Sequence, residues 1–392
     1  MKILVLNHNI IGEGTWLRAW NVARELARSH DVEIATVSST RRWKPHRYAR
    51  DGCQVIEMPY WTSRRLAASG LSAIDIACRI HWMTRRPWDV LIGFSSLPSV
   101  GLPFLFARRR FPDRCGVSDW DDLFCDGGMY EYLNKGVTRP LYRFERWLEH
   151  TVRRRADLVT VTSRYLEQKA RDIGVTAPIL YLSGGADVDG IRPMDRAECR
   201  KRLELPENCC LVFYLSGGFS EDARLLLDAF ALAAAEDRSL LLVMSGDMKE
   251  KYRREINRLK LTERVLLTGR IRYEEVPWYL GAADILAMPL QDTLNSRARG
   301  PIKLRDYLCA GRPIVGSALG EVKEIMSRHD VGLLADASHE SFARALMALA
   351  RAPDRRERMG TEARRVAEKL SWRNMVDSLE TALQDVAGSG KR

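Results

Sequence analysis

Segments typical of strands alternate with segments typical of helices along the whole chain, and this alternation limits the possible folds most strongly. Short apolar runs such as 2–7 (KILVLN) and 89–96 (DVLIGFSS) are separated by longer amphipathic stretches such as 16–29. Strands that alternate with helices form parallel sheets whose two faces are covered by the helices. The sequence therefore predicts an α/β fold.

The pattern of strands and helices is interrupted once, near the middle of the chain. A polar segment rich in Gly and Asp, 184–196 (GGADVDGIRPMDR), separates the two halves. A chain of 392 residues is too long for one ordinary hydrophobic core. We therefore expect two domains, at 1–184 and 198–371, joined by a hinge at 185–197.

Hydropathy and the pattern of cysteines indicate the cellular compartment of the protein. No apolar stretch reaches the roughly 18 residues that cross a bilayer. The first apolar run ends at Asn7, which predicts a first strand and not a signal peptide. The eight cysteines form no CxxC pair and the seven histidines form no HxxxH pattern. We expect buried, reduced thiols, a cytoplasmic protein and no metal site.

The net charge of +11 comes mostly from arginine, which occurs in runs. The runs lie at 41–42, 64–65, 85–86, 108–110 and 153–155. They fit solvated helix ends, where cations offset the helix dipole. They also fit attraction to an anionic partner, such as the inner face of a membrane or a phosphorylated acceptor. No nucleic-acid-binding motif is present, so no nucleic-acid partner is expected.

Three loops could carry chemistry, because ligands bind at the carboxyl ends of parallel strands. The first is 9–15 (NIIGEGT), where two glycines permit a tight turn and the helix amides favour an anion or a carbohydrate oxygen. Leu17 stands where a dinucleotide fingerprint needs its third glycine. A plain strand-to-helix turn explains this loop equally well. Its candidate substrate-binding residues are Gly12, Glu13, Gly14 and Trp16.

The second loop, 116–128 (GVSDWDDLFCDGG), gathers aspartates and aromatic side chains after a strand. Carboxylates bind sugar hydroxyls, aromatic faces suit a pyranose ring, and acidic clusters can also hold a divalent cation. A capped, solvated loop is the alternative. The candidate substrate-binding residues are Asp119, Trp120, Asp121 and Asp122, with Phe124 and Asp126 beside them.

The third loop begins a helix that carries a cation and an anion on one face. Pro301 suits a first helical turn, and Lys303 and Asp306 lie three residues apart. A lysine can bind a diphosphate as a point charge, and an aspartate can accept hydrogen bonds from a ribose diol. An exposed ion pair is the alternative, and the spacing alone does not decide between the two.

This third segment resembles the donor-site signature of the retaining GT-B glycosyltransferases of family 4. Asp306 falls at the second acidic position of the signature, followed by LCAGRPIV, whereas Ala298 occupies the first acidic position. A variant signature has Asn, a basic residue and P-x-K-L-x-[DE]-Y. The residues that match it are Asn295, Arg299, Pro301, Lys303, Asp306 and Tyr307.

The resemblance extends over nearly the whole chain. The segments 184–193, 214–231 and 265–290 are similar to the interdomain, glycine-turn and nucleotide-base segments of the family, and SDWDDL resembles its D-x-H-D-L loop. Ser216 and Glu221 stand near the usual Arg and Lys of the glycine turn. Arg224, Lys303 or Arg299 would then neutralise the diphosphate.

The resemblance implies two Rossmann-like domains facing across a cleft, with a last helix at 372–388 packing back on the first. The first domain would bind a hydroxyl acceptor, anionic or membrane-linked, and the second a nucleoside-diphosphate sugar. Transfer would retain the anomeric configuration, with the donor phosphate deprotonating the acceptor, and would need no metal or other cofactor. The implied nucleotide-binding residues are Gly218, Arg224, Gly269, Arg270, Ile271, Asn295, Arg299, Lys303 and Asp306.

Within that scheme Lys303 would take a catalytic role at the diphosphate, and Asp119 and Asp121 would lie beside the reacting hydroxyl. A non-catalytic nucleotide-sugar-binding subunit is the alternative, because the first acidic position is lost and the glycine turn is atypical. A nicotinamide-dependent dehydrogenase is disfavoured, since neither half carries the glycine fingerprint.

Overall fold

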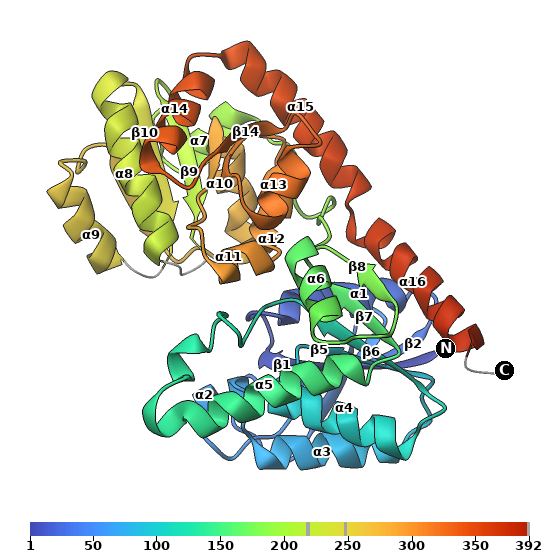
Figure 1. The fold of residues 1–392 in the computed structure, drawn as a ribbon. Coiled ribbons are helices and arrows are strands. Elements are labelled where there is room, and N and C mark those ends of the chain that lie inside the picture. The colour runs from blue at the N-terminus through green and yellow to red at the C-terminus, as the bar shows by residue number, and fades with distance from the viewer. Residues whose placement is uncertain (217–219, 247–248, 390–392) are drawn as a thin grey trace. The chain divides into compact units, whose positions relative to one another are not determined.

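A computed structural model describes residues 1–216, 220–246 and 249–389 (Figure 1). They form two compact units, each with its own sheet and core. Unit 1 comprises Met1–Gly184, Ala298–Gly300 and Trp372–Arg392, and unit 2 comprises Gly185–Arg297 and Pro301–Ser371. The predicted α/β fold is confirmed, because helices pack on predominantly parallel sheets in both units.

The sheet of unit 1 has eight strands in the order β3-β4-β2-β1-β5-β6-β7-β8. Their bounds are β1 Lys2–Ile10, β2 Asp31–Val37, β3 His46–Arg50, β4 Cys53–Met58, β5 Val90–Phe94, β6 Cys115–Trp120, β7 Leu158–Val161 and β8 Ile179–Tyr181. All neighbours are parallel except β3 and β4. Strands β2, β4 and β3 lie on one side of β1, and the chain then crosses to the other side, where β5 to β8 follow. A topological switch point, where ligands bind in open α/β sheets, therefore lies between β1 and β5.

Helices cover both faces of this sheet. They are α1 Trp16–Leu26, α2 Arg64–Ala68, α3 Ala73–Thr84, α4 Pro98–Arg110, η1 Glu131–Leu133, η2 Gly136–Thr138, α5 Arg139–Arg154, α6 Arg164–Asp172 and α16 Trp372–Ser389. The central strands are buried on both faces, as near-continuous apolar runs predict. The last helix, α16, packs on α1 in the core of unit 1 through apolar side chains that include Trp372 and Leu379.

The sheet of unit 2 is entirely parallel, in the order β11-β10-β9-β12-β13-β14. Its strands are β9 Cys210–Leu215, β10 Leu240–Ser245, β11 Val265–Gly269, β12 Ile285–Met288, β13 Ile314–Ser317 and β14 Gly332–Ala335. Its helical elements are α7 Arg196–Arg202, α8 Ser220–Glu236, α9 Lys249–Arg258, η3 Tyr273–Glu275, α10 Val276–Ala282, α11 Leu294–Ala298, α12 Ile302–Cys309, α13 Gly320–Met326, α14 His339–Ala350 and α15 Pro353–Lys369. The switch point of this sheet lies between β9 and β12.

The structure departs from the expected elements at two places in unit 1. The antiparallel edge strand β3 was not predicted, because its sequence HRYAR has almost no apolar side chains. The sequence over 64–85 predicts one helical stretch, which the structure divides into α2 and α3. Gly70 adopts a φ of +74° between them, and Ser72 caps the second helix. A glycine in the left-handed region followed by a serine cap ends one helix and begins the next.

The segment 185–197, expected as a hinge, packs on unit 2. Ala186 and Ile191 are buried in its core, and Arg364 of α15 donates hydrogen bonds to the carbonyl groups of Val188 and Ile191. In the residues that the structure describes, no helix is long and apolar enough to cross a membrane.

Candidate functional site

The loop after β1 is held in a tight turn at the switch point of unit 1. Gly12 and Gly14 have φ angles of +83° and +50°. The side-chain oxygen of Asn9 accepts a hydrogen bond from the backbone amide of Thr15 at 2.9 Å. A Cβ atom at Gly14 would lie 2.8 Å from that oxygen, so this position requires glycine. The Thr15 hydroxyl donates to Asp121 at 2.6 Å, which ties the loop to the end of β6.

Asp119, at the end of β6, is engaged in a buried ion pair. Nε and Nη2 of Arg18 donate to its two carboxylate oxygens at 2.9 and 2.8 Å, and the Thr160 hydroxyl donates at 2.5 Å. Arg18 also donates to the carbonyl groups of Leu182 and Ser183. Both oxygens of Asp119 therefore have partners within the protein. The geometry assigns Asp119 to positioning and not to direct contact with a reacting hydroxyl.

Arg18 was not among the residues predicted from the sequence. Arg18 lies between Trp16 and Ala19 on the buried face of α1, which is apolar apart from Arg18 and Glu25. A lone arginine among buried neighbours has to find a carboxylate or several carbonyl groups, because an unpaired buried charge is strongly destabilising.

Asp121, in the loop after β6, has a pKa close to neutral pH. Burial raises its pKa to about 7, with the charges of Asp122 and Asp119 adding to the effect and the Thr15 hydrogen bond opposing it. Burial also raises the pKa of Asp122, which the charge of Arg299 lowers. A carboxyl group with a pKa near the working pH can accept a proton or a hydrogen bond from a substrate hydroxyl.

The pKa of Asp121 leads to a prediction for stability. The native state binds this proton more tightly than the unfolded chain, where the pKa is about 3.9. The stability contributed by Asp121 is therefore present at pH 4 and is lost as the pH rises through 7. Asp121→Asn, which keeps an oxygen acceptor for Thr15, should exceed the wild type in free energy of unfolding by about 4 kcal/mol at pH 8, with little difference at pH 4. Urea unfolding at both pH values measures this, and a difference independent of pH would contradict it.

The aromatic side chains expected to contact a sugar are in the core, which corrects the prediction. Trp120 is fully buried, donates to Glu149 at 3.2 Å and carries the guanidinium of Arg153 over its ring at 4.8 Å. Trp16 is buried and stacks on Trp20, with ring centroids 5.4 Å apart. Both rings fill space between the sheet and its helices, so neither is placed to stack on a pyranose. Glu13, in contrast, is partly exposed and pairs with an arginine of α2.

In unit 2, α12 is attached to the two strands that flank the switch point. The ammonium group of Lys303 donates to the carbonyl oxygen of Leu215, the last residue of β9, at 3.1 Å and lies 4.8 Å from the centroid of the Tyr214 ring. The Tyr307 hydroxyl accepts from the Leu215 amide at 2.9 Å and donates to the Ala287 carbonyl of β12 at 3.2 Å. Lys303 thus lies at the carboxyl end of β9, where a ligand of this sheet is expected.

Asp306 lies on the same helix with a buried side chain. The pKa of its carboxyl group is raised to about 7, mainly by burial and also by the nearby charge of Asp187, whereas the charge of Arg305 lowers it. Arg305 itself forms a fully buried ion pair with Glu321, which joins α12 to α13. Asp306 is buried and Lys303 is half-buried. They are therefore not an exposed ion pair, which was the alternative interpretation of their spacing.

The other residues expected to bind the nucleotide are distributed around this edge. Gly269 ends β11 with a φ of +77°, and its carbonyl accepts from the Gly246 amide at 2.9 Å, which joins the loops after β10 and β11. Arg270 is exposed and Ile271 half-buried. Gly218 lies outside the described residues.

Three further candidates differ in their surroundings. Arg224 is exposed on α8, with its Nε 3.7 Å from Asp228. Asn295 lies on α11, and its side-chain oxygen is buried. Arg299 follows in the segment 298–300, which groups with unit 1. The structure therefore brings Lys303, Asp306 and the Gly269 turn to one sheet, whereas Arg299 is associated with Asp122.

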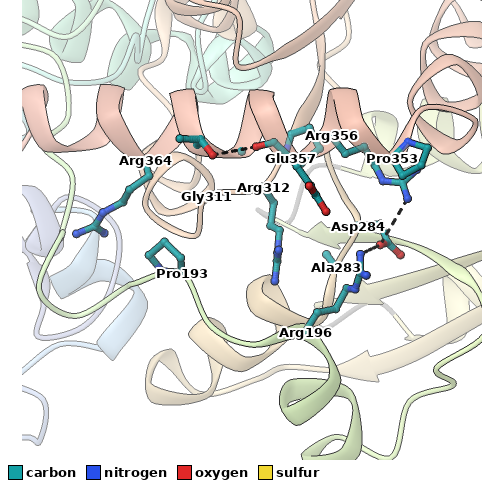
Figure 2. Close-up of a pocket in the computed structure, with 13 residues that line it drawn as sticks. Pro193, Arg196, Ala283, Asp284, Gly311, Arg312, Pro353, Arg356, Glu357 and Arg364 are labelled. Atoms are coloured by element: carbon teal, nitrogen blue, oxygen red, sulfur yellow. Dashed lines mark hydrogen bonds and ion pairs between the residues drawn. The ribbon is translucent and has the colours of Figure 1, made fainter.

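A pocket of about 430 Å³ lies at the opposite edge of the sheet of unit 2, before β12 and β13 (Figure 2). Arginines line the pocket, but their guanidinium groups bind nearby backbone carbonyl and carboxylate groups. Arg312 donates to the carbonyl groups of Met194 and Gly281, and Arg196 pairs with Asp284. Gly281 lies at the end of α10, where a cation offsets the helix dipole. We assign this pocket a structural role. In the described part of the chain, no cluster of three or more His, Cys, Asp or Glu could hold a metal ion.

Two sequence families match the two halves of the chain. Residues 195–366 match "Glycosyl transferases group 1", and residues 13–185 match "Glycosyl transferase 4-like domain". A GDP-mannose-dependent alpha-(1-6)-phosphatidylinositol monomannoside mannosyltransferase of Mycobacterium tuberculosis is 28% identical over 58% of this chain and 61% of its own length. A D-inositol 3-phosphate glycosyltransferase of Rhodococcus jostii is 27% identical over 57% of this chain and 51% of its own. The matched region thus spans about 61% or less of these relatives.

Solved structures resemble the fold over nearly its whole length. A sucrose-phosphate synthase from Thermosynechococcus elongatus has a TM-score of 0.77 at 17% identity and covers 99% of both chains. WaaG, a glycosyltransferase involved in lipopolysaccharide biosynthesis, has a TM-score of 0.71 at 17% identity, covering 98% of this chain and all of its own. Anabaena HepE in complex with UDP and glucose has a TM-score of 0.73 at 15% identity, with the same coverage. The fold is GT-B.

Proposed function

The chain belongs to the group 1 glycosyl transferases, and we propose that it transfers a sugar from a nucleoside-diphosphate sugar to a hydroxyl group. The observation that carries this proposal is the attachment of α12 at the switch point of unit 2. Lys303 and Tyr307 both contact the end of β9, and both belong to the segment that resembles the donor-site signature. A cation is thereby fixed at the sheet edge where a nucleotide is expected.

The proposed donor site assigns separate roles to separate groups. Lys303 neutralises the diphosphate, and its charge stabilises that group most when it leaves. Asp306 accepts hydrogen bonds from the ribose, and the backbone of 269–271 meets the base. Asn295, on α11 of the same unit, is assigned to the sugar. Because GDP-mannose appears in the names of several relatives, GDP-mannose is the first donor to test.

The proposed acceptor site lies at the end of β6 in unit 1. Asp121, with a pKa of about 7, receives a hydrogen bond or a proton from the acceptor hydroxyl, while Asp119 and Arg18 hold the loop in place. We propose that transfer retains the anomeric configuration. Relatives named for phosphatidylinositol and inositol phosphate acceptors suggest an inositol-containing acceptor, which for a lipid would place the enzyme at the cytoplasmic face of a membrane.

Turnover of a labelled donor tests this function. The full-length protein is incubated with GDP-mannose or UDP-glucose, with and without an inositol-containing acceptor, and the release of nucleoside diphosphate is followed. We expect slow release without acceptor and faster release with it, and NMR of the product reports its anomeric configuration. A donor that binds but stays intact under all conditions would instead identify a non-catalytic nucleotide-sugar-binding subunit.

Substitution of Asp306 should affect ground-state binding. A ribose contact is similar in the ground and transition states, so Asp306→Ala should raise KM for the donor and Kd for the free nucleoside diphosphate, with a smaller change in kcat. Asp306→Asn keeps the shape and one acceptor oxygen and should be milder. Steady-state kinetics and calorimetry on both variants measure this. A loss confined to kcat would exclude the ribose role.

The reaction should proceed without a divalent metal. The charge of the leaving diphosphate is assigned to Lys303 and backbone amides, and D-W-D at 119–121 lies in the unit assigned to the acceptor. Turnover in excess EDTA should therefore remain close to turnover in magnesium. If EDTA abolishes turnover and manganese or magnesium restores it, the assignment of charge neutralisation to protein groups is wrong.

A further inference from the structure

Exposed tryptophans and arginines occur together on two segments of unit 1. Trp43 and Trp61 are 69% and 46% exposed, with ring centroids 5.2 Å apart. Arg41 donates to the backbone carbonyl of Trp61 at 2.9 Å, which joins the loop before β3 to the segment after β4. The arginines at 64–65 and the exposed Leu66 follow directly on α2. Large apolar side chains are thus held on the surface next to cations.

Helix α5 carries the same combination on its outer face. Phe144 and Trp147 are exposed, and their rings stack with centroids 6.0 Å apart. Arg143 and Arg139 are exposed on the same helix, one and five residues before Phe144. The opposite face of α5 is buried, so the helix is amphipathic with a basic and aromatic outer side.

The loop before α5 connects these two areas. The side chain of Tyr130 interacts with Ser69 at the end of α2. Tyr132 and Val137, on either side of the turn that leads into α5, are both exposed. We call the exposed side chains of 41–43, 61–66 and 132–147 the basic-aromatic surface.

The charge of this surface is strongly one-sided. Its three segments contain eight Lys and Arg residues and a single acid, Glu145, which is buried. Three of the eight basic residues pair with carboxylates outside the segments. Isolated exposed apolar side chains are common on proteins, but aromatic rings interleaved with arginines are typical of segments that lie in the headgroup layer of a membrane.

We propose that the basic-aromatic surface binds an anionic membrane, with its aromatic rings among the headgroups and its arginines on lipid phosphates. Arg64 of this surface pairs with Glu13 at 2.7 Å, so the surface borders the loop after β1. A lipid-linked acceptor would meet that loop without leaving the membrane surface. The proposal does not rest on the proposed function, because a vesicle alone is the ligand.

Cosedimentation of the full-length protein with vesicles tests the proposal. The protein should bind vesicles that contain phosphatidylglycerol, bind pure phosphatidylcholine much less, and be released as salt is added. Arg139→Gln with Arg143→Gln should lower the partition coefficient about 25-fold, because each basic side chain at an anionic surface contributes roughly fivefold. Phe144→Ser with Trp147→Ser should also weaken binding, through loss of the buried apolar area.

Matched control substitutions lie in unit 2. Leu232 and Arg238 are exposed there, and the double variant Leu232→Ser with Arg238→Gln should bind like the wild type. Circular dichroism confirms that each variant folds. If the wild type fails to bind anionic vesicles, or if the α5 variants bind as well as the control, the proposal is overturned. Since no donor is present, neither outcome bears on glycosyl transfer.

Discussion

Lys303→Met should lower kcat/KM for the active donor by roughly two to three orders of magnitude. Such a loss is typical when one group that stabilises a leaving anion is removed. The ammonium group is held at the end of β9 by the Leu215 carbonyl and the Tyr214 ring, so its charge is fixed in place before the donor binds. Methionine keeps the length of the side chain, and the loss should therefore reflect the charge. Initial rates at several donor concentrations measure it.

Lys323→Met is the matched control, because Lys323 is exposed on α13 of the same unit. Its kinetics should equal those of the wild type. Melting temperatures of both variants separate a catalytic effect from unfolding. Near-normal turnover in Lys303→Met would remove the diphosphate from this helix and with it the mechanism proposed for the leaving group.

Arg18→Met should destabilise unit 1 by about 3–5 kcal/mol, because it leaves the carboxylate of Asp119 buried without its partner. Arg18 also satisfies the carbonyl groups of Leu182 and Ser183, which adds to the loss. Every tryptophan except Trp278 belongs to unit 1, so tryptophan fluorescence during urea unfolding follows this unit.

Two further variants complete the test of the buried pair. Replacing both partners, as in Arg18→Met with Asp119→Leu, should recover much of the stability, since two apolar groups leave no unpaired charge. Arg64→Ala breaks the exposed pair with Glu13 and should change stability by no more than about 1 kcal/mol. A similarly small effect of Arg18→Met would show that Asp119 is not held as the structure indicates.

The architecture could be predicted because each strand leaves a strong local signal. Apolar runs such as that of β1 indicate buried parallel strands without knowledge of their neighbours. The edge strand β3 left no such signal, because it is polar and exposed and is defined only by pairing with β4. Similarly, the division between α2 and α3 depends on the left-handed backbone conformation of Gly70. It could not be predicted, because a glycine inside a helical pattern often keeps the helical conformation.

The part of the candidate site that lies within one continuous segment of sequence could be predicted. Lys303 and Asp306 share a helix that follows a strand, so their place at the carboxyl edge could be expected. The partner of Asp119 could not, because Arg18 is 101 residues away along the chain and only the fold brings them together. Trp120 was misjudged for a related reason: sequence shows an aromatic ring among acids but not which face of β6 it occupies. The burial of Trp120 shows that it is a core residue and not a ring on which a sugar could stack.

We propose that the end of β9 and α12 in unit 2 bind a nucleoside diphosphate, and calorimetric titration measures this binding. GDP, UDP, TDP and ADP are titrated into the full-length wild type and into Lys303→Met. The free diphosphate carries the charge that develops on the leaving group, so its affinity reports on Lys303. We expect saturable binding of at least one of the four and at least about tenfold weaker binding by the variant, the equivalent of about 1.4 kcal/mol. No binding of any of the four by the wild type, or undiminished binding by the variant, would contradict the claim.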